Sequence, residues 1–130
     1  MKLADTCVWI EALAGTATGE RYYALLQDTE NLLVPTLVQY ELRRWCLRTL
    51  RSGLSEEVAD KAIAATRAAQ VVALDESTAL YAAELAQSHG LATVDALLYA
   101  TALREQAQLV TCDAHFEGLP GVDYQPKLGH

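Results

Sequence analysis

Short apolar runs of strand length alternate along the chain with longer segments of helical periodicity. Strands this brief and apolar, separated by helices, are typical of a parallel sheet with both faces covered. We therefore expect an α/β fold, with a central parallel sheet of four or five short strands flanked by helices on both faces. The expected strands are Lys2–Ala4, Asn31–Pro35, Val71–Leu74, Leu109–Cys112 and a final short one around Val122–Tyr124.

Capping residues and glycines mark the ends of the helical segments. Ser55 opens one helix in the style of a capping box, and Thr93 is expected to cap the last long helix. Gly15, Gly53 and Gly90 each follow a helical segment directly or within its closing turn. The expected helices are Cys7–Ala14, Gly19–Gln27, Leu37–Leu50, Ser55 to about Gln70, Glu76–Ser88 and Thr93 to about Gln106.

The length of 130 residues suits one domain, because domains commonly have roughly 100–200 residues. The longest apolar runs have five residues, whereas a transmembrane helix needs about 18 or more. Asp5 stands where a signal peptide would need an apolar segment, so we expect a cytoplasmic protein. Cys7, Cys46 and Cys112 form no paired motif, which predicts reduced thiols.

The charge balance is acidic, and the cations are concentrated in one helix. Seventeen acidic and ten basic residues give a net charge of −7, which argues against the broad basic surface of sequence-independent nucleic-acid binders. Arg44, Arg48 and Arg51 share one stripe of their helix at i, i+4 and i+7. This stripe could bind phosphate, or it could be a solvated face that complements the helix C-terminus.

Four carboxylates interrupt an apolar pattern or follow a strand. Glu41 shares the apolar face of its helix with Val38, where an unpaired charge is costly. Asp95 lies in the first turn of a helix rich in Ala and Leu, and Asp5 and Asp113 each directly follow an expected strand. Open α/β sheets place ligand sites at such strand ends. Taken singly, each acid is also explained by a rim position, a salt bridge, a turn or a helix cap.

Taken together, the four acids suggest a site for hard cations. Mg²⁺ and Mn²⁺ prefer oxygen ligands in octahedral geometry, and bound ions would hold like charges close together. Two divalent ions would change the formal charge from −7 to −7 + 4 = −3, which makes the site more attractive to phosphate. Sequence spacing alone does not show that the four side chains converge.

Four strings occur in a fixed order along the chain: DTCVWI at 5–10, EL at 41–42, TVDALLYATA at 93–102 and LVTCDAHF at 109–116. In this order they resemble the PIN-domain ribonucleases, and the small VapC-type toxins most of all. The resemblance extends from about residue 2 to residue 124. It implies a single PIN-like domain over residues 1–130 with a short C-terminal tail.

The resemblance also implies which residues form the site. Asp5, Glu41, Asp95 and Asp113 match the family's acidic quartet, which binds one or two Mg²⁺ or Mn²⁺ ions. Thr111 matches a supporting hydroxyl residue, and Thr6 matches the small polar residue after the first aspartate, which we expect near the substrate. Cys7 departs from the pattern, because serine or asparagine is common at its position.

The activity implied by the resemblance is hydrolysis of RNA phosphodiester bonds by a metal-dependent endoribonuclease. It would be the toxin of a type II toxin–antitoxin pair. A homodimer is implied as well, together with a cognate antitoxin that covers the acidic pocket and displaces metal or substrate.

Other function classes stay open. A metal-dependent phosphatase of the haloacid dehalogenase type also has an aspartate after its first strand, but it needs an acid at position 7, which is cysteine. A receiver-like module would bind magnesium with clustered acids, yet no lysine follows a late strand. A catalytically silent acidic interaction domain would use the same acids only as caps and rim residues. His89, His115 and His130 show no metal-ligand spacing.

Overall fold

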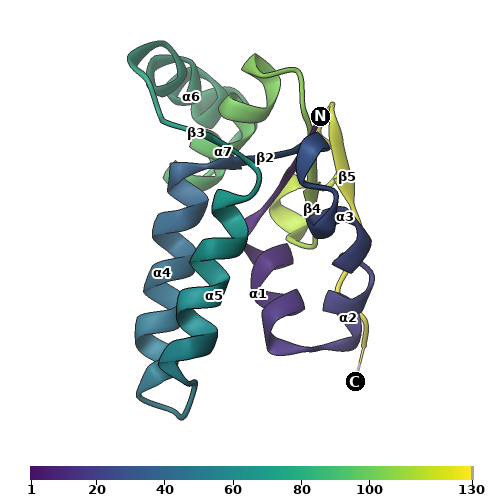
Figure 1. The fold of residues 1–130 in the computed structure, drawn as a ribbon. Helices are drawn as coiled ribbons and strands as arrows, with labels where there is room; N and C mark the ends of the chain where they lie inside the picture. The colour runs from purple at the N-terminus through teal and green to yellow at the C-terminus, as the bar shows by residue number, and fades with distance from the viewer. Residues whose placement is uncertain (130) are drawn as a thin grey trace.

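The computed structural model describes residues 1–129, which form a five-stranded parallel sheet with helices on both faces (Figure 1). The strand order is β3-β2-β1-β4-β5, and every neighbouring pair is parallel. This confirms the expected α/β architecture, including its short last strand. The strands are β1 (Lys2–Ala4), β2 (Leu32–Pro35), β3 (Gln70–Val72), β4 (Gln108–Thr111) and β5 (Val122–Tyr124). His130 lies outside the described residues.

Helices connect the strands in the order that the periodicity predicts. None of the helices within residues 1–129 is long and apolar enough to cross a membrane. The α-helices are α1 (Thr6–Ala14), α2 (Ala17–Glu20), α3 (Tyr23–Gln27), α4 (Thr36–Leu50), α5 (Glu56–Arg67), α6 (Glu76–His89) and α7 (Thr93–Arg104), and the 3-10 helices are η1 (Thr29–Asn31) and η2 (Ala114–Phe116).

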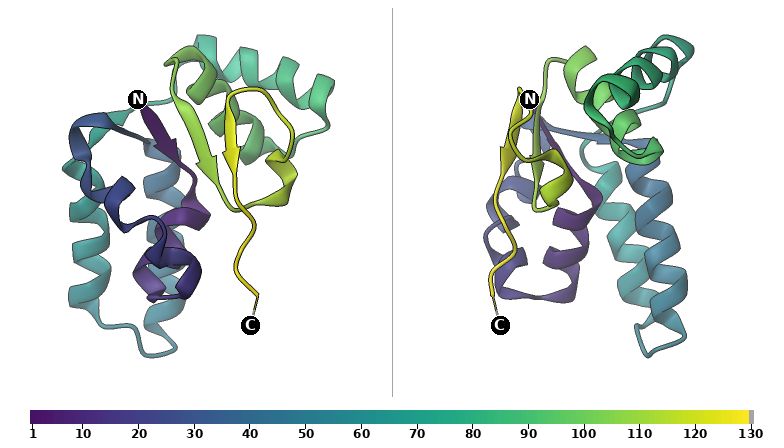
Figure 2. Two further views of the ribbon diagram at one scale, coloured as in Figure 1. Left: turned by 90° about the vertical axis from the view of Figure 1, so that its right-hand side faces the viewer. Right: turned by 180° about the vertical axis from the view of Figure 1, so that it is seen from behind.

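Two apolar layers enclose the sheet because successive strand residues point to opposite faces. Ala4 and Val110 pack in the layer that contains residues of α1, α4 and α5. Leu3 and Leu109 pack on the other face with residues of α6 and α7. Figures 1 and 2 show α4 and α5 side by side as a long hairpin, with α6 and α7 packed together away from it.

The register between β1 and β4 fixes the position of the first acid. Ala4 is paired with Val110, so the next residues along the chain, Asp5 and Thr111, lie opposite one another. The Asp5 N–H donates a hydrogen bond of 2.9 Å to the Val110 carbonyl. β2 flanks β1 on its other side, and α4 begins directly after β2. The carboxyl ends of three neighbouring strands therefore lead into the segments that carry candidate site residues.

One expected helix is divided in the structure. The segment Gly19–Gln27 forms the end of α2 and all of α3, with a break between them. The helical turn starts earlier than predicted because the Thr16 hydroxyl caps it, accepting a 3.0 Å hydrogen bond from the Gly19 N–H. A Cβ at Gly19 would clash with the backbone carbonyl of Glu11. This glycine therefore permits close packing of α2 on α1 and does not mark a helix start.

Two further expectations were wrong in detail. A buried strand was expected at Val71–Leu74. The strand found there is β3, which lies at the edge of the sheet, and Val71 is 41% exposed. An edge strand has a neighbour on one side only, and hydropathy does not reveal the strand order. The cap expected at Thr93 lies at Ala92, where the backbone is still extended, and the Thr93 side chain makes no capping hydrogen bond.

Candidate active site

Asp5 is a buried carboxylate at the carboxyl end of β1, and it caps α1. Its side chain accepts hydrogen bonds from the Thr6 N–H at 2.7 Å and from the Thr111 hydroxyl at 2.8 Å. Burial raises the pKa of Asp5 to about 6, and the charge of Glu41 also raises this pKa, against the lowering effect of the hydrogen bonds. The ionised form of Asp5 is therefore less favourable here, relative to the protonated form, than it is in water.

Glu41 comes from α4 and meets the first turn of α1. Its Oε1 accepts a 2.6 Å hydrogen bond from the Thr6 hydroxyl. Thr6 therefore donates to both acids, to Asp5 through its backbone N–H and to Glu41 through its hydroxyl. Val38 and Leu42, on either side of Glu41, are fully buried, so Glu41 lies on an apolar face as expected. The hydroxyl of Thr6 supplies the polar partner that the carboxylate needs there.

Thr111 joins the ends of the two central strands. Its hydroxyl donates to Asp5 and accepts a 2.9 Å hydrogen bond from the backbone N–H of Asp113. Thr111 is fully buried, so both bonds are shielded from water. This supports the positioning function expected for the threonine.

Asp95 and Asp113 meet around His115. The Nδ1 atom of His115 lies 3.3 Å from Asp95 Oδ2 and 3.4 Å from Asp113 Oδ1. One donor atom from each of the three residues lies within 4.8 Å of the others. Burial and the charge of Asp113 raise the pKa of Asp95, while His115 acts to lower it. A cavity of about 220 Å³ borders this group and is lined in part by Asp95 and His115.

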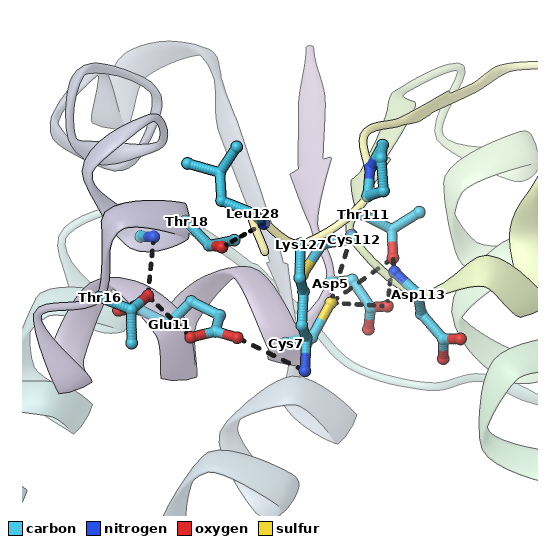
Figure 3. Close-up of polar contacts among 12 residues, drawn as sticks. Asp5, Cys7, Glu11, Thr16, Thr18, Thr111, Cys112, Asp113, Lys127 and Leu128 are labelled. Atoms are coloured by element: carbon cyan, nitrogen blue, oxygen red, sulfur yellow. Dashed lines mark hydrogen bonds and ion pairs between the residues drawn. The ribbon is translucent and has the colours of Figure 1, made fainter. Parts of the chain in front are cut away.

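The structure places the four acids as two pairs, and the group that could hold a metal ion among the described residues contains Asp95, Asp113 and His115 but neither Asp5 nor Glu41. Asp5 and Glu41 share Thr6 as a hydrogen-bonding neighbour, and Asp95 and Asp113 share His115. Thr111 connects the two pairs, because it bonds to the side chain of Asp5 and to the backbone of Asp113. Figure 3 shows Asp5, Thr111 and Asp113 side by side at the ends of β1 and β4.

Sulfur atoms lie beside this group. The Cys7 Sγ is 3.5 Å from Asp5 Oδ2, 3.5 Å from Thr111 Oγ1 and 3.5 Å from the backbone nitrogen of Cys112 (Figure 3). Hydrogen bonding to Cys112 and burial raise the pKa of the Cys7 thiol. All three cysteines are free, as the sequence predicts.

Comparison with known proteins assigns the family. The sequence profile of the PIN domain matches residues 2–122. The chain belongs to the PIN domain family. PIN domain toxins are nucleases, so membership supports a hydrolase acting on nucleic acid. Among curated protein sequences, none matches this PIN domain.

Solved structures share the fold at low sequence identity. A toxin–antitoxin complex from Klebsiella pneumoniae is 20% identical, with a TM-score of 0.78 and coverage of 95% of this chain and 96% of the other. VapC20 from Mycobacterium tuberculosis, described as a toxin that cleaves the sarcin–ricin loop, is 22% identical, with a TM-score of 0.70 and coverage of 92% and 95%. VapBC2 from Rickettsia felis, bound to promoter DNA, is 19% identical, with a TM-score of 0.70 and coverage of 97% and 98%.

The arginine stripe of this PIN domain begins near Glu41 and extends along α4 away from the acids. Arg44 is one helical turn beyond Glu41, whereas Arg51 follows the end of α4, about 15 Å farther along the axis than Glu41 at 1.5 Å per residue. Arg44, Arg48 and Arg51 are exposed. Within residues 1–129, no carboxylate forms an ion pair with any of them.

His115 is the site residue that the sequence analysis missed. The histidines lack metal-ligand spacing in the sequence, yet the ring of His115 contacts two of the four acids. The available signal was its place two residues after Asp113. The Asp113 carboxylate caps η2 by accepting a 3.0 Å hydrogen bond from the His115 N–H, and this turn brings the imidazole back over the acids.

Proposed function

We propose that this PIN domain is a metal-dependent endoribonuclease, the toxin of a type II toxin–antitoxin pair. The observation that carries the proposal is the position of Thr111. A single buried hydroxyl connects Asp5, which follows β1, to the segment that carries Asp113 after β4. This connection supports one site built from acids that are distant in sequence.

The donor set fits one or two Mg²⁺ or Mn²⁺ ions. Asp5, Glu41, Asp95 and Asp113 offer carboxylate oxygens, which these ions prefer. The pKa values of Asp5 and Asp95 are raised by burial and by a neighbouring carboxylate, so a cation among them would relieve a real electrostatic cost. Bound metal would supply a water of lowered pKa and neutralise charge on the phosphate.

The chain's own groups would position the reaction. Thr6 holds Glu41 and Thr111 holds Asp5, so the carboxylates keep their orientation without metal. Asp95 or Asp113 would accept the proton of the attacking water. The Thr6 hydroxyl already donates to Glu41, which favours positioning; contact between Thr6 and RNA stays a prediction. Arg44, Arg48 and Arg51 would bind phosphates of the RNA beyond the cut.

The partners follow from the fold neighbours. The solved relatives include toxin–antitoxin complexes, and one is described as a toxin that cleaves the sarcin–ricin loop. By analogy, we infer a homodimer and a cognate antitoxin that covers the acids. We also infer a cytoplasmic location, where an RNA substrate is present.

Digestion of total RNA tests the proposal. Purified protein is incubated with RNA and Mn²⁺ or Mg²⁺, and the cut ends are mapped. Asp5→Asn is the test variant, and Asp60→Asn is the matched control because it makes the same change at an exposed acid of α5. We expect discrete cuts by the wild type and by Asp60→Asn, and none by Asp5→Asn or after chelation. Full cutting by folded Asp5→Asn would refute the proposal.

A further inference from the structure

Two of the three cysteines lie together where the central strands end. The Asp5 N–H is bonded to the Val110 carbonyl, and Cys7 and Cys112 each stand two residues farther along from these bonded residues. The backbone N–H of Cys112 points at the Cys7 Sγ, with 3.5 Å between nitrogen and sulfur.

Cys7 contacts one of the proposed metal ligands, Asp5, and the threonine that holds it. Its sulfur reaches Asp5 Oδ2 and Thr111 Oγ1 at 3.5 Å each. Cys7 is half-buried and Cys112 is 5% exposed. Cys46 is fully buried on α4 and serves as an internal reference thiol.

We propose that Cys7 and Cys112 are a modification site at which hydrogen peroxide forms a reversible disulfide, and that this disulfide weakens cation binding at the adjacent carboxylates. The second half rests on the proposed function, whereas the formation of the disulfide does not. The geometry supports the pair because the Cys7 Sγ already lies 3.5 Å from the backbone nitrogen of Cys112 across the β1–β4 junction.

The chemistry balances with hydrogen peroxide as the oxidant. The two thiols lose two electrons and two protons as the Sγ–Sγ bond forms. The O–O bond of the peroxide breaks, and its oxygens leave as two waters with those protons. A dithiol reductant reverses the change by thiol–disulfide exchange.

The disulfide would alter the site in two ways. A bonded pair of sulfurs is about 2.05 Å apart, so Cys7 would lose its S–H donor and move from its contact with Asp5. The bond would also tie the first turn of α1 to the residue before Asp113. Changes to groups that orient metal ligands typically reduce metal affinity about tenfold to a hundredfold, and we expect an effect of that size.

The experiment uses the full chain, reduced and then exposed to hydrogen peroxide. Free thiols are counted after denaturation, the linked peptides are identified by mass spectrometry, and Mn²⁺ binding is measured by calorimetry. Cys112→Ser and Cys7→Ser remove the pair, and Cys46→Ser is the control that keeps it. We expect Cys7 to be linked to Cys112 in both proteins, with the free thiols falling from three to one in the wild type and from two to none in Cys46→Ser.

The Mn²⁺ measurement separates the two proposals. Weaker Mn²⁺ binding by the oxidised wild type, restored by dithiothreitol and absent from Cys112→Ser, would support the inference. Three remaining thiols, a link to Cys46, or equal Mn²⁺ affinity of reduced and oxidised protein would overturn it. If even the reduced protein bound no Mn²⁺, the proposed function and the effect on binding would fall, while a Cys7–Cys112 link would still establish the modification site.

Discussion

The Thr6 hydroxyl donates a 2.6 Å hydrogen bond to Glu41, a residue 35 positions away in the sequence. The bond joins the first turn of α1 to α4 beside the buried Asp5. Glu41 thereby obtains a fixed donor on a helix face whose neighbouring residues are apolar and buried. A short bond to a charged acceptor is among the stronger kinds of protein hydrogen bond.

Replacing Thr6 tests this bond. Thr6→Val keeps the shape but removes the donor, which leaves a partly buried carboxylate unpaired at a cost of about 1–3 kcal/mol. We expect lower thermal stability without metal and weaker Mn²⁺ binding, measured by calorimetry. Thr6→Ser is the matched control, because it retains the hydroxyl. Equal behaviour of the two variants would show that the bond does not position Glu41.

Stability without metal should fall as Asp5 ionises. The folded pKa of about 6 is above the ordinary value of 3.8, so the folded state binds the proton more tightly than the unfolded state. The Asp5 contribution is therefore full below about pH 4 and is lost as the pH rises through about 6, by up to about 3 kcal/mol at 1.36 kcal/mol per pKa unit.

Asp5→Asn should remove this dependence while keeping a residue that caps helices well. Urea unfolding with a chelator is measured at pH 5 and pH 7.5. We expect Asp5→Asn to gain stability relative to the wild type at the higher pH, and the difference to shrink at pH 5. The same pH slope in both proteins would contradict the assigned cause.

The sequence predicts the elements of this fold well because their patterns are local. Apolar runs such as Leu109–Cys112 and helix signals such as Ser55 depend on neighbouring residues only. The exposure of β3 and the division at Gly19 depend on packing between distant segments, which periodicity does not contain.

The site shows the same division. Asp5 and Asp113 could be proposed from their places after strands, but their proximity depends on β1 and β4 being neighbours. The resemblance to a family supplied that information for the four acids. It did not supply the contact of His115 with Asp95, which arises from the turn of η2.

His115 should favour Mn²⁺ over Mg²⁺. It adds an imidazole nitrogen to two carboxylates, and imidazole is a better ligand for transition metals than for Mg²⁺. We expect His115→Phe, which keeps a ring without nitrogen, to weaken Mn²⁺ binding about tenfold and to change Mg²⁺ binding much less. Competition between the ions in calorimetry measures this, and an equal loss for both would exclude a nitrogen ligand.

The arginine stripe should set the salt dependence of RNA binding. Replacing Arg44, Arg48 and Arg51 by glutamine changes the net charge from −7 to −7 − 3 = −10. If all three contact phosphates, the slope of log K against log salt should decrease in magnitude by about 2, at roughly 0.7 per contact for single strands.

The matched control for the stripe makes the same change in net charge elsewhere. Lys2, Lys61 and Arg104 are replaced by glutamine, and binding of a catalytically inactive background to RNA is measured over a range of salt concentrations. We expect the control to keep the wild-type slope. An unchanged slope in the arginine variant would assign the stripe to helix stabilisation.

The most direct test of the central claim, that the four acids form one cation site, is titration of Mn²⁺ into the metal-free, reduced protein by calorimetry. We expect saturable binding by the wild type and by Asp60→Asn, and its loss in both Asp5→Asn and Asp95→Asn, which alter different pairs of the cluster. Absence of saturable binding by the wild type, or wild-type affinity in both site variants, would contradict the claim.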